Sequence, residues 1–151
     1  MKDHGDVFIL GISALYHDSA ACLIRNGEII TAVQEERFTR VKHDSSFPVN
    51  SIGYCIESAG ITPGEISHVV FYEKPLLKFD RLTQTYVRFA PRGLRSFFLA
   101  MNSFLGGKLS VSKDIVKTLD SGYDGEILYV HHHQSHAASA FFPSPFGSAA
   151  G

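Results

Sequence analysis

Three short apolar runs, each the length of a β-strand, open the chain and constrain its fold more than any other feature. They cover Val7 to Ile12, Ser19 to Ile24 and Glu28 to Val33. The dipeptide Asn26-Gly27 lies between the second and third runs, and it favours two-residue type I′ hairpin turns. The sequence therefore predicts three consecutive strands, of which the last two form a tight hairpin.

Helical and strand patterns alternate through the rest of the chain. After Pro48, apolar residues spaced for a helix end at Gly60, which suits a C-terminal cap. The later patterns predict a strand over 68–73, helices over 79–89 and 94–105, a shorter helix over about 112–119, and a fifth strand over 126–130. This β-β-β-α-β-α-β-α order, with several helices in its second helical layer, predicts an α/β fold. Its mixed five-stranded sheet has an antiparallel hairpin at one edge and parallel strands beyond it.

The helix predicted over 94–105 has aromatic residues and a methionine along one side. We expect this side to face the core, since an apolar stripe on a helix usually does so. An exposed surface for a partner is the alternative.

Length and composition set limits on the class of protein. A chain of 151 residues is expected to form one domain, residues 1–151. A net charge of −1 with 44% apolar residues argues against a disordered or nucleic-acid-binding chain. Neither a membrane-spanning run nor a signal peptide is recognisable. We therefore expect neither a nucleic-acid nor a membrane partner. Cys22 and Cys55 fit buried hydrophobic positions better than a disulfide, which fits a cytoplasmic location.

Four of the eight histidines fall within residues 131–136, directly after the fifth predicted strand. On a helix, His132 and His136 would share one face, and imidazoles paired in this way can bind a metal ion together. A solvated histidine run or an expression tag is the alternative reading. The run continues into the apolar residues 137–142, which favours a metal site or a place near phosphate.

His17 and Asp18 follow the first predicted strand. In open α/β sheets, ligands gather beyond the carboxyl ends of parallel strands, and the first and fifth strands should end at the same edge. A histidine oriented by a carboxylate suits proton abstraction. A harmless turn cap is the alternative for this pair.

The stretch 34–44 follows the third predicted strand, and six of its eleven residues are formally charged. It has no helical apolar face, so we expect a loop. The loop is either simply solvated or a clamp for an anionic substrate, in which Arg37, Arg40 and Lys42 would meet phosphate or carboxylate.

Several of these motifs together resemble the N-terminal part of the nodulation/antibiotic O-carbamoyltransferase family. The resemblance extends over nearly the whole chain, from residue 8 to residue 146. The motifs that carry it most clearly are Ile9-Leu10-Gly11-Ile12, Tyr16-His17-Asp18-Ser19-Ala20-Ala21, Gln34-Glu35-Glu36-Arg37-Phe38-Thr39-Arg40, Lys42-His43 and His132-His133-Gln134-Ser135-His136-Ala137.

This resemblance implies the first subdomain of an actin-like ATPase (ribonuclease H-like) fold. Members of the family bind ATP and a divalent metal, here iron, magnesium, manganese or zinc, between two such subdomains. A second domain converts carbamoyl phosphate to carbamate. The first domain then makes carbamoyl-adenylate and passes the carbamoyl group to a hydroxyl of a small molecule or glycan, in nodulation or antibiotic biosynthesis.

The resemblance also implies roles for individual residues. The metal-binding histidines of the family match His132 and His136, and its proposed catalytic histidine matches His17, beside Asp18. The pairs Glu36-Arg37 and Lys42-His43 fall in the substrate-side loop of the family. His131, an additional histidine, could shift the assignment of the metal ligands by one position.

Family members continue with a phosphate loop, a second subdomain and the carbamate-forming domain. We therefore expect residues 1–151 to be part of a longer enzyme, inactive alone, with uncovered surface through which it could self-associate. The alternatives are another actin-like ATPase, for tRNA threonylcarbamoyl transfer or small-molecule phosphorylation, and a non-enzymatic metal-binding module.

Overall fold

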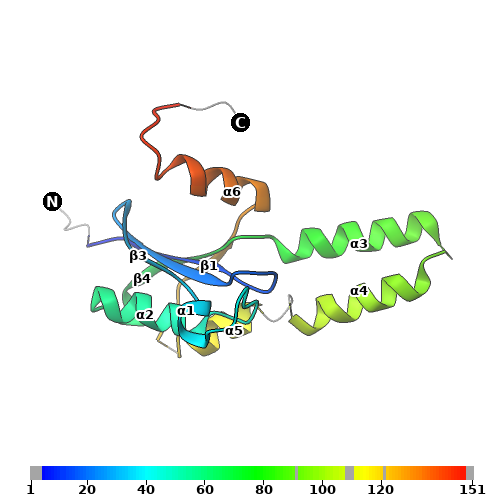
Figure 1. Cartoon of the computed structure of the whole chain (residues 1–151), viewed down its shortest axis with the longest axis horizontal. Helices are drawn as coiled ribbons and strands as arrows, with labels where there is room; N and C mark the ends of the chain where they lie inside the picture. Colours follow the sequence, from blue (N-terminus) through cyan, green and yellow to red (C-terminus); the bar gives the residue numbers. More distant parts are fainter. Residues whose placement is uncertain (1–4, 91, 108–110, 121, 149–151) are drawn as a thin grey trace.

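Five strands form one mixed β-sheet at the centre of the molecule (Figure 1). The computed structural model describes residues 5–90, 92–107, 111–120 and 122–148, except the side chains at 75–79, 81–82, 100 and 103–107. The sheet order is β3-β2-β1-β4-β5. The strands are β1 (Phe8–Ser13), β2 (Ala20–Arg25), β3 (Glu28–Gln34), β4 (Ile66–Phe71) and β5 (Glu126–Tyr129).

Strand directions follow the predicted scheme. β1 and β3 both run antiparallel to β2, whereas β1, β4 and β5 run parallel to one another. Asn26 and Gly27, between β2 and β3, have φ angles of 51° and 90°, as both central residues of a type I′ turn require. The predicted mixed sheet with a hairpin edge is therefore confirmed.

Helices occupy both faces of the sheet and extend beyond it. In Figure 1, α2 and α5 lie on one face, α6 lies over the other, and α3 and α4 project together to one side. The helices are α1 (Glu36–Thr39), α2 (Val49–Ala59), α3 (Pro75–Phe89), α4 (Leu94–Gly107), α5 (Val111–Thr118) and α6 (His132–Phe141), with a 3₁₀ turn, η1 (Pro63–Glu65), before β4. No helix in the described part of the chain combines the length and apolarity needed to span a membrane.

The core lies between the sheet and the α2/α5 layer. Alternate residues of β1 are buried, and Leu10 is fully inaccessible, as expected for a strand with one face on a core. Ile52 and Cys55 from α2 and Ile115 from α5 pack into the same cluster. Burial of each such aliphatic side chain contributes roughly 2 kcal/mol. Both cysteines are free thiols; Cys55 is buried as predicted, whereas Cys22 is only half-buried.

The α3/α4 pair differs from the sequence prediction, which placed the apolar side of residues 94–105 in the core. Phe97 stacks on Tyr86 of α3, with ring centroids 4.2 Å apart. Phe98 and Leu99 are 56% and 64% exposed. The short link between the helices turns α4 back along α3. The described part of the apolar side of α4 therefore contacts α3 or is exposed to solvent. The predicted positions Phe79, Leu82, Phe104 and Leu105 lie outside the described side chains.

Smaller differences concern a short helix and the start of a strand. Glu36–Thr39 form the short helix α1 within the predicted loop. One helical turn needs no apolar face of its own, so periodicity gives no signal for it. β4 begins at Ile66, two residues before the predicted start, because Ile66 packs into the core.

Candidate functional site

The candidate residues gather at the edge of the sheet where the parallel strands have their carboxyl ends. β1, β4 and β5 are parallel and end at this edge, and the β1–β2 and β3–α2 connections meet there. His17 and Asp18 come from the first connection, and Glu36 and His43 from the second. His132 and His136 follow β5. Chain topology alone therefore brings three separated segments to one place.

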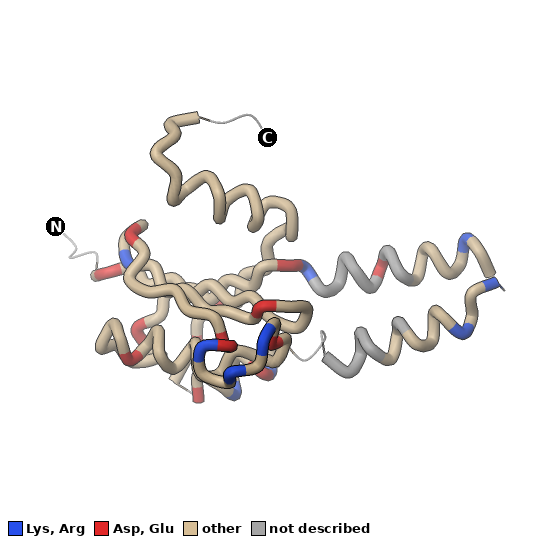
Figure 2. The backbone as a smooth tube through the Cα atoms, viewed as in Figure 1, with Lys and Arg blue, Asp and Glu red and all other residues tan. Residues whose placement is uncertain are grey.

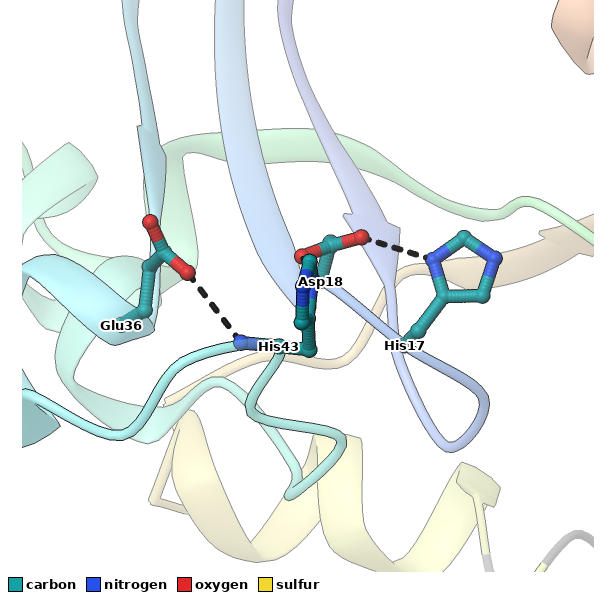
Figure 3. A network of polar contacts seen from close by, with 4 residues as sticks. All are labelled: His17, Asp18, Glu36 and His43. Carbon is teal, nitrogen blue, oxygen red and sulfur yellow. Dashed lines mark hydrogen bonds and ion pairs between the residues drawn. The ribbon is translucent and has the colours of Figure 1, made fainter.

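Asp18 is the centre of a polar cluster at this edge (Figure 3). Its Oδ2 lies 2.8 Å from Nδ1 of His17, and its Oδ1 lies 2.9 Å from Nδ1 of His43. The backbone N–H of His43 also donates to Glu36 Oε2 at 3.2 Å. Both imidazoles are largely exposed, with side-chain exposures of 61% and 62%. One carboxylate thus holds two accessible histidine rings.

Hydrogen bonding fixes the protonation pattern of this cluster. The bonds from His43 and then His17 hold the pKa of Asp18 below its ordinary value. An ionised carboxylate can only accept hydrogen bonds, so Nδ1 carries the proton on both rings. In the neutral form of each ring, Nε2 is then left with a lone pair, which is the requirement for a general base.

The backbone around Asp18 is tied to the second loop and locally strained. The N–H groups of Leu15 and Ser19 donate to the carbonyls of Ser45 and Asp44, at 3.1 and 2.8 Å. Leu15, Asp18 and His43 have φ angles of 69°, 52° and 57°. Side chains other than glycine rarely adopt this left-handed region, and such residues cluster at functional sites.

Glu35 is an important residue of this region that sequence reasoning treated only as part of a charged loop. The residue is only 1% exposed. Oε1 accepts from the backbone and side-chain nitrogens of Asn50 at 3.1 and 2.7 Å. Oε2 accepts from the backbone N–H and hydroxyl of Ser51 at 2.8 and 2.6 Å. Because Pro48, the N-cap of α2, provides no side-chain hydrogen bond, Glu35 caps this helix from a distance.

Glu35 also connects the cap to the Asp18 cluster. Its backbone N–H donates to the Ser19 carbonyl at 2.8 Å, and Glu36 follows directly. The β3–α2 connection is therefore anchored at its start, beside the loop that carries Asp18. No sequence signal distinguishes the buried Glu35 from the half-buried Glu36 next to it.

His132 and His136 face one another on the first turns of α6. Their Nε2 atoms are 3.2 Å apart. Two ligands of one tetrahedral ion, each about 2.0–2.1 Å from it, are about 3.3 Å apart. A hydrogen bond between the rings would give a similar separation. Among the described residues, no group of three or more His, Cys, Asp or Glu side chains is arranged to hold a metal ion.

Tyr72 packs against the His132–His136 pair and has Tyr16 as an electrostatic neighbour. Its ring meets the His132 ring edge-on, with centroids 5.6 Å apart, and its carbonyl accepts from the Ser135 hydroxyl at 3.2 Å. Burial raises the pKa of Tyr72, and the nearby Glu73 and Tyr16 raise it further. Tyr16 in turn packs on His17 at 4.5 Å. Tyr16 thus contacts His17, and Tyr72 contacts His132.

The remaining predicted residues are more scattered. Arg37 and His136 line a cavity of about 660 Å³ between α6 and the open sheet face, whose floor contains Gly11 and Ala20. Lys42 and Arg40 are exposed. His131 Nε2 lies 3.3 Å from Lys74 Nζ, so this ring is engaged apart from the His132–His136 pair.

Comparison with known proteins gives one family. Residues 8–150 match the family described as Carbamoyltransferase N-terminus. The chain is 57% identical over 148 residues to an uncharacterized protein of Synechocystis, covering 94% of this chain and 24% of that protein. It is 34% identical over 131 residues to the nodulation protein NolNO of Sinorhizobium fredii, covering 86% and 18%.

A third relative, an uncharacterized protein of Methanocaldococcus jannaschii, is 30% identical over 118 residues, covering 72% of this chain and 21% of that protein. The chain spans about a quarter or less of the length of these three relatives.

Proposed function

This chain belongs to the Carbamoyltransferase N-terminus family, and from this membership we propose that it provides the acceptor-activating part of an O-carbamoyltransferase. The complete enzyme would form carbamoyl-adenylate from ATP and the carbamate released from carbamoyl phosphate. It would then transfer the carbamoyl group to a hydroxyl of a small molecule or glycan. The chain would be the first subdomain of an actin-like ATPase fold, a proposal consistent with the order of its five-stranded sheet.

The observation that carries this proposal is the contact between His17 Nδ1 and Asp18 Oδ2 at 2.8 Å. An alcohol oxygen attacks a carbamoyl carbon readily only when a base removes its proton. Asp18 orients the His17 ring and leaves Nε2 to accept that proton. The carbamoyl carbon–oxygen bond to the adenylate phosphate then breaks, and AMP leaves. His17 is therefore the proposed base, and Asp18 orients it.

Two side chains of this chain fit a divalent metal ion. His132 and His136 are borderline-soft nitrogen ligands, and their Nε2 separation of 3.2 Å suits two positions on one ion. A bound ion would provide a positive charge for phosphate oxygens. The edge contact with Tyr72 and the hydroxyl of Ser135, which donates to the His132 carbonyl at 2.7 Å, hold this turn of α6 in place.

The charged loop is the proposed substrate side of the site. Arg37, at the cavity, and the exposed Lys42 provide positive charge there, and Glu36 holds the backbone of His43. Guanidinium and ammonium groups of this kind bind phosphate or carboxylate.

Product analysis tests the proposal. The full-length protein is incubated with ATP, carbamoyl phosphate and a panel of hydroxyl-bearing acceptors, and the acceptors are examined by mass spectrometry. We expect a carbamate ester whose formation requires both ATP and carbamoyl phosphate. A phosphorylated acceptor formed without carbamoyl phosphate would instead identify a small-molecule kinase of the same superfamily.

A further inference from the structure

We propose that His43 is a positioning residue that orients His17 through the carboxylate of Asp18, a role that rests on the proposed function of His17 as the base. The sequence alone suggested a different role for His43, on the substrate side of the loop. The two roles make different demands on the ring, and the hydrogen bonds of the cluster distinguish them.

The first step of the argument is the division of the carboxylate between the two rings. Oδ1 of Asp18 accepts from His43 and Oδ2 accepts from His17. A carboxylate with only one oxygen bound can still turn about its terminal bond. With both oxygens bound, its plane is fixed, so the donor on Oδ1 determines the direction in which Oδ2 meets His17.

The second step is that His43 is itself held independently of His17. Its N–H donates to Glu36, and the carbonyl of the next residue, Asp44, accepts from Ser19. The backbone of His43 is left-handed, with φ of 57°, and its ring contacts Asp18. A residue whose own N–H and whose neighbour's carbonyl are both hydrogen-bonded, in a conformation that side chains rarely adopt, suits a fixed support.

The third step concerns which atoms of His43 are occupied. Nδ1, the nitrogen nearer the backbone, is used by Asp18, so only the outer edge of the ring is left for a substrate. The same bond also contributes most to keeping Asp18 ionised, since it is the largest cause of the lowered pKa of that carboxyl. An ionised Asp18 can only accept a hydrogen bond, so it keeps the proton of His17 on Nδ1.

Two substitutions separate the side chain of His43 from its backbone. His43→Asn keeps an amide N–H close to the position of Nδ1, and asparagine tolerates positive φ. His43→Gly also tolerates positive φ but removes the donor. Spectra of residues 1–151 that resolve individual backbone amides establish that each variant is folded.

The first measurement is the tautomer of His17 in residues 1–151, from long-range proton–nitrogen correlation NMR at about pH 8, where an ordinary imidazole is neutral. We expect the Nδ1–H form in wild type and in His43→Asn, and a shift toward the Nε2–H form in His43→Gly. An unchanged His17 tautomer in His43→Gly would overturn the positioning role.

The second measurement uses the full-length enzyme with varied acceptor. We expect His43→Gly to lower kcat by roughly 10- to 100-fold, part of the 10²–10⁴ that a general base contributes, with KM for the acceptor nearly unchanged and kcat largely restored in His43→Asn. A raised KM at unchanged kcat would make His43 a substrate contact instead. The NMR measurement needs no turnover, so the two proposals can fail separately. Absence of carbamoyl transfer would contradict the proposed function, whereas the tautomer of His17 decides whether His43 positions it.

Discussion

Asp18 and His43 lie 25 residues apart in the chain, yet Oδ1 of the first accepts a hydrogen bond from Nδ1 of the second at 2.9 Å. This contact joins the loop after β1 to the loop after β3. Two backbone hydrogen bonds join the same loops, from Leu15 to Ser45 and from Ser19 to Asp44. Together they make one structural unit from two segments that the sequence separates by a β-hairpin.

The Asp18 cluster predicts a pH-dependent stability. The folded pKa of Asp18 is depressed by His43 and His17, so its stabilising contribution is complete above the unfolded pKa, about 4, and is lost as pH falls through the folded value. The difference in Tm between wild type and Asp18→Asn should therefore narrow as pH falls from about 6 to about 3. Asp124→Asn, at an exposed aspartate before β5, is the control. A difference in Tm for Asp18→Asn that stays constant over this range would contradict the account.

We predict that Glu35 contributes more to the free energy of unfolding than its position in a charged stretch suggests. Glu35→Gln replaces an acceptor by a donor that faces the N–H and hydroxyl of Ser51. Since hydrogen bonds to buried charged groups contribute about 1.5–3 kcal/mol each, the free energy of unfolding should fall by about 2 kcal/mol or more. Urea denaturation at neutral pH measures it. The exposed Glu28→Gln should change it by less than about 0.5 kcal/mol; equal effects of both substitutions would refute the capping role.

Asp18 and Glu35 also mark the limit of what the sequence could predict. The hairpin turn and the strand order followed from Asn26-Gly27 and from apolar periodicity, because local propensity and burial alone determine them. Topology then placed His17 and His132 at one edge. The hydrogen bond between Asp18 and His43 depends on the path of two irregular loops, and the burial of Glu35 depends on α2 lacking its own cap. Neither feature produces a periodic pattern in the sequence.

The metal pair gives a prediction that needs no enzymatic activity. Residues 1–151 should bind zinc or iron(II) weakly through His132 and His136, since two imidazoles leave most of the coordination shell to water. His136→Ala should abolish this binding, and His68→Gln, at an exposed position of β4, should leave it intact. Calorimetric titration of the three proteins compares their affinities. Equal affinity in wild type and His136→Ala would rule out the pair as ligands.

The α3/α4 pair predicts self-association of the 151-residue chain. Val87 and Phe89 of α3 and Phe98 and Leu99 of α4 are each more than half exposed. So much exposed apolar surface on one helix pair is usually covered by association, commonly as a symmetric dimer. Arg88, Arg92 and Arg95 are close in sequence to the link between α3 and α4, where Figure 2 shows several Lys or Arg positions. Repulsion between these positive charges on two copies should weaken association at low salt.

Sedimentation velocity measures this association over a range of protein and salt concentrations. Phe98→Ser should shift the protein toward monomer, whereas Val116→Ser, at an exposed position of α5, should not. A wild-type chain that stays monomeric throughout would show that this surface does not associate with a second copy.

The central claim is that His17 removes the proton of the acceptor hydroxyl after the carbamoyl group has been activated. The most direct measurement compares the two half-reactions in the full-length protein with His17→Asn, following pyrophosphate release for adenylate formation and carbamate ester for transfer. The account predicts adenylate formation close to that of wild type and transfer reduced by about 10²-fold or more. Loss of both half-reactions to the same degree would contradict it, and would make His17 a nucleotide-site or structural residue.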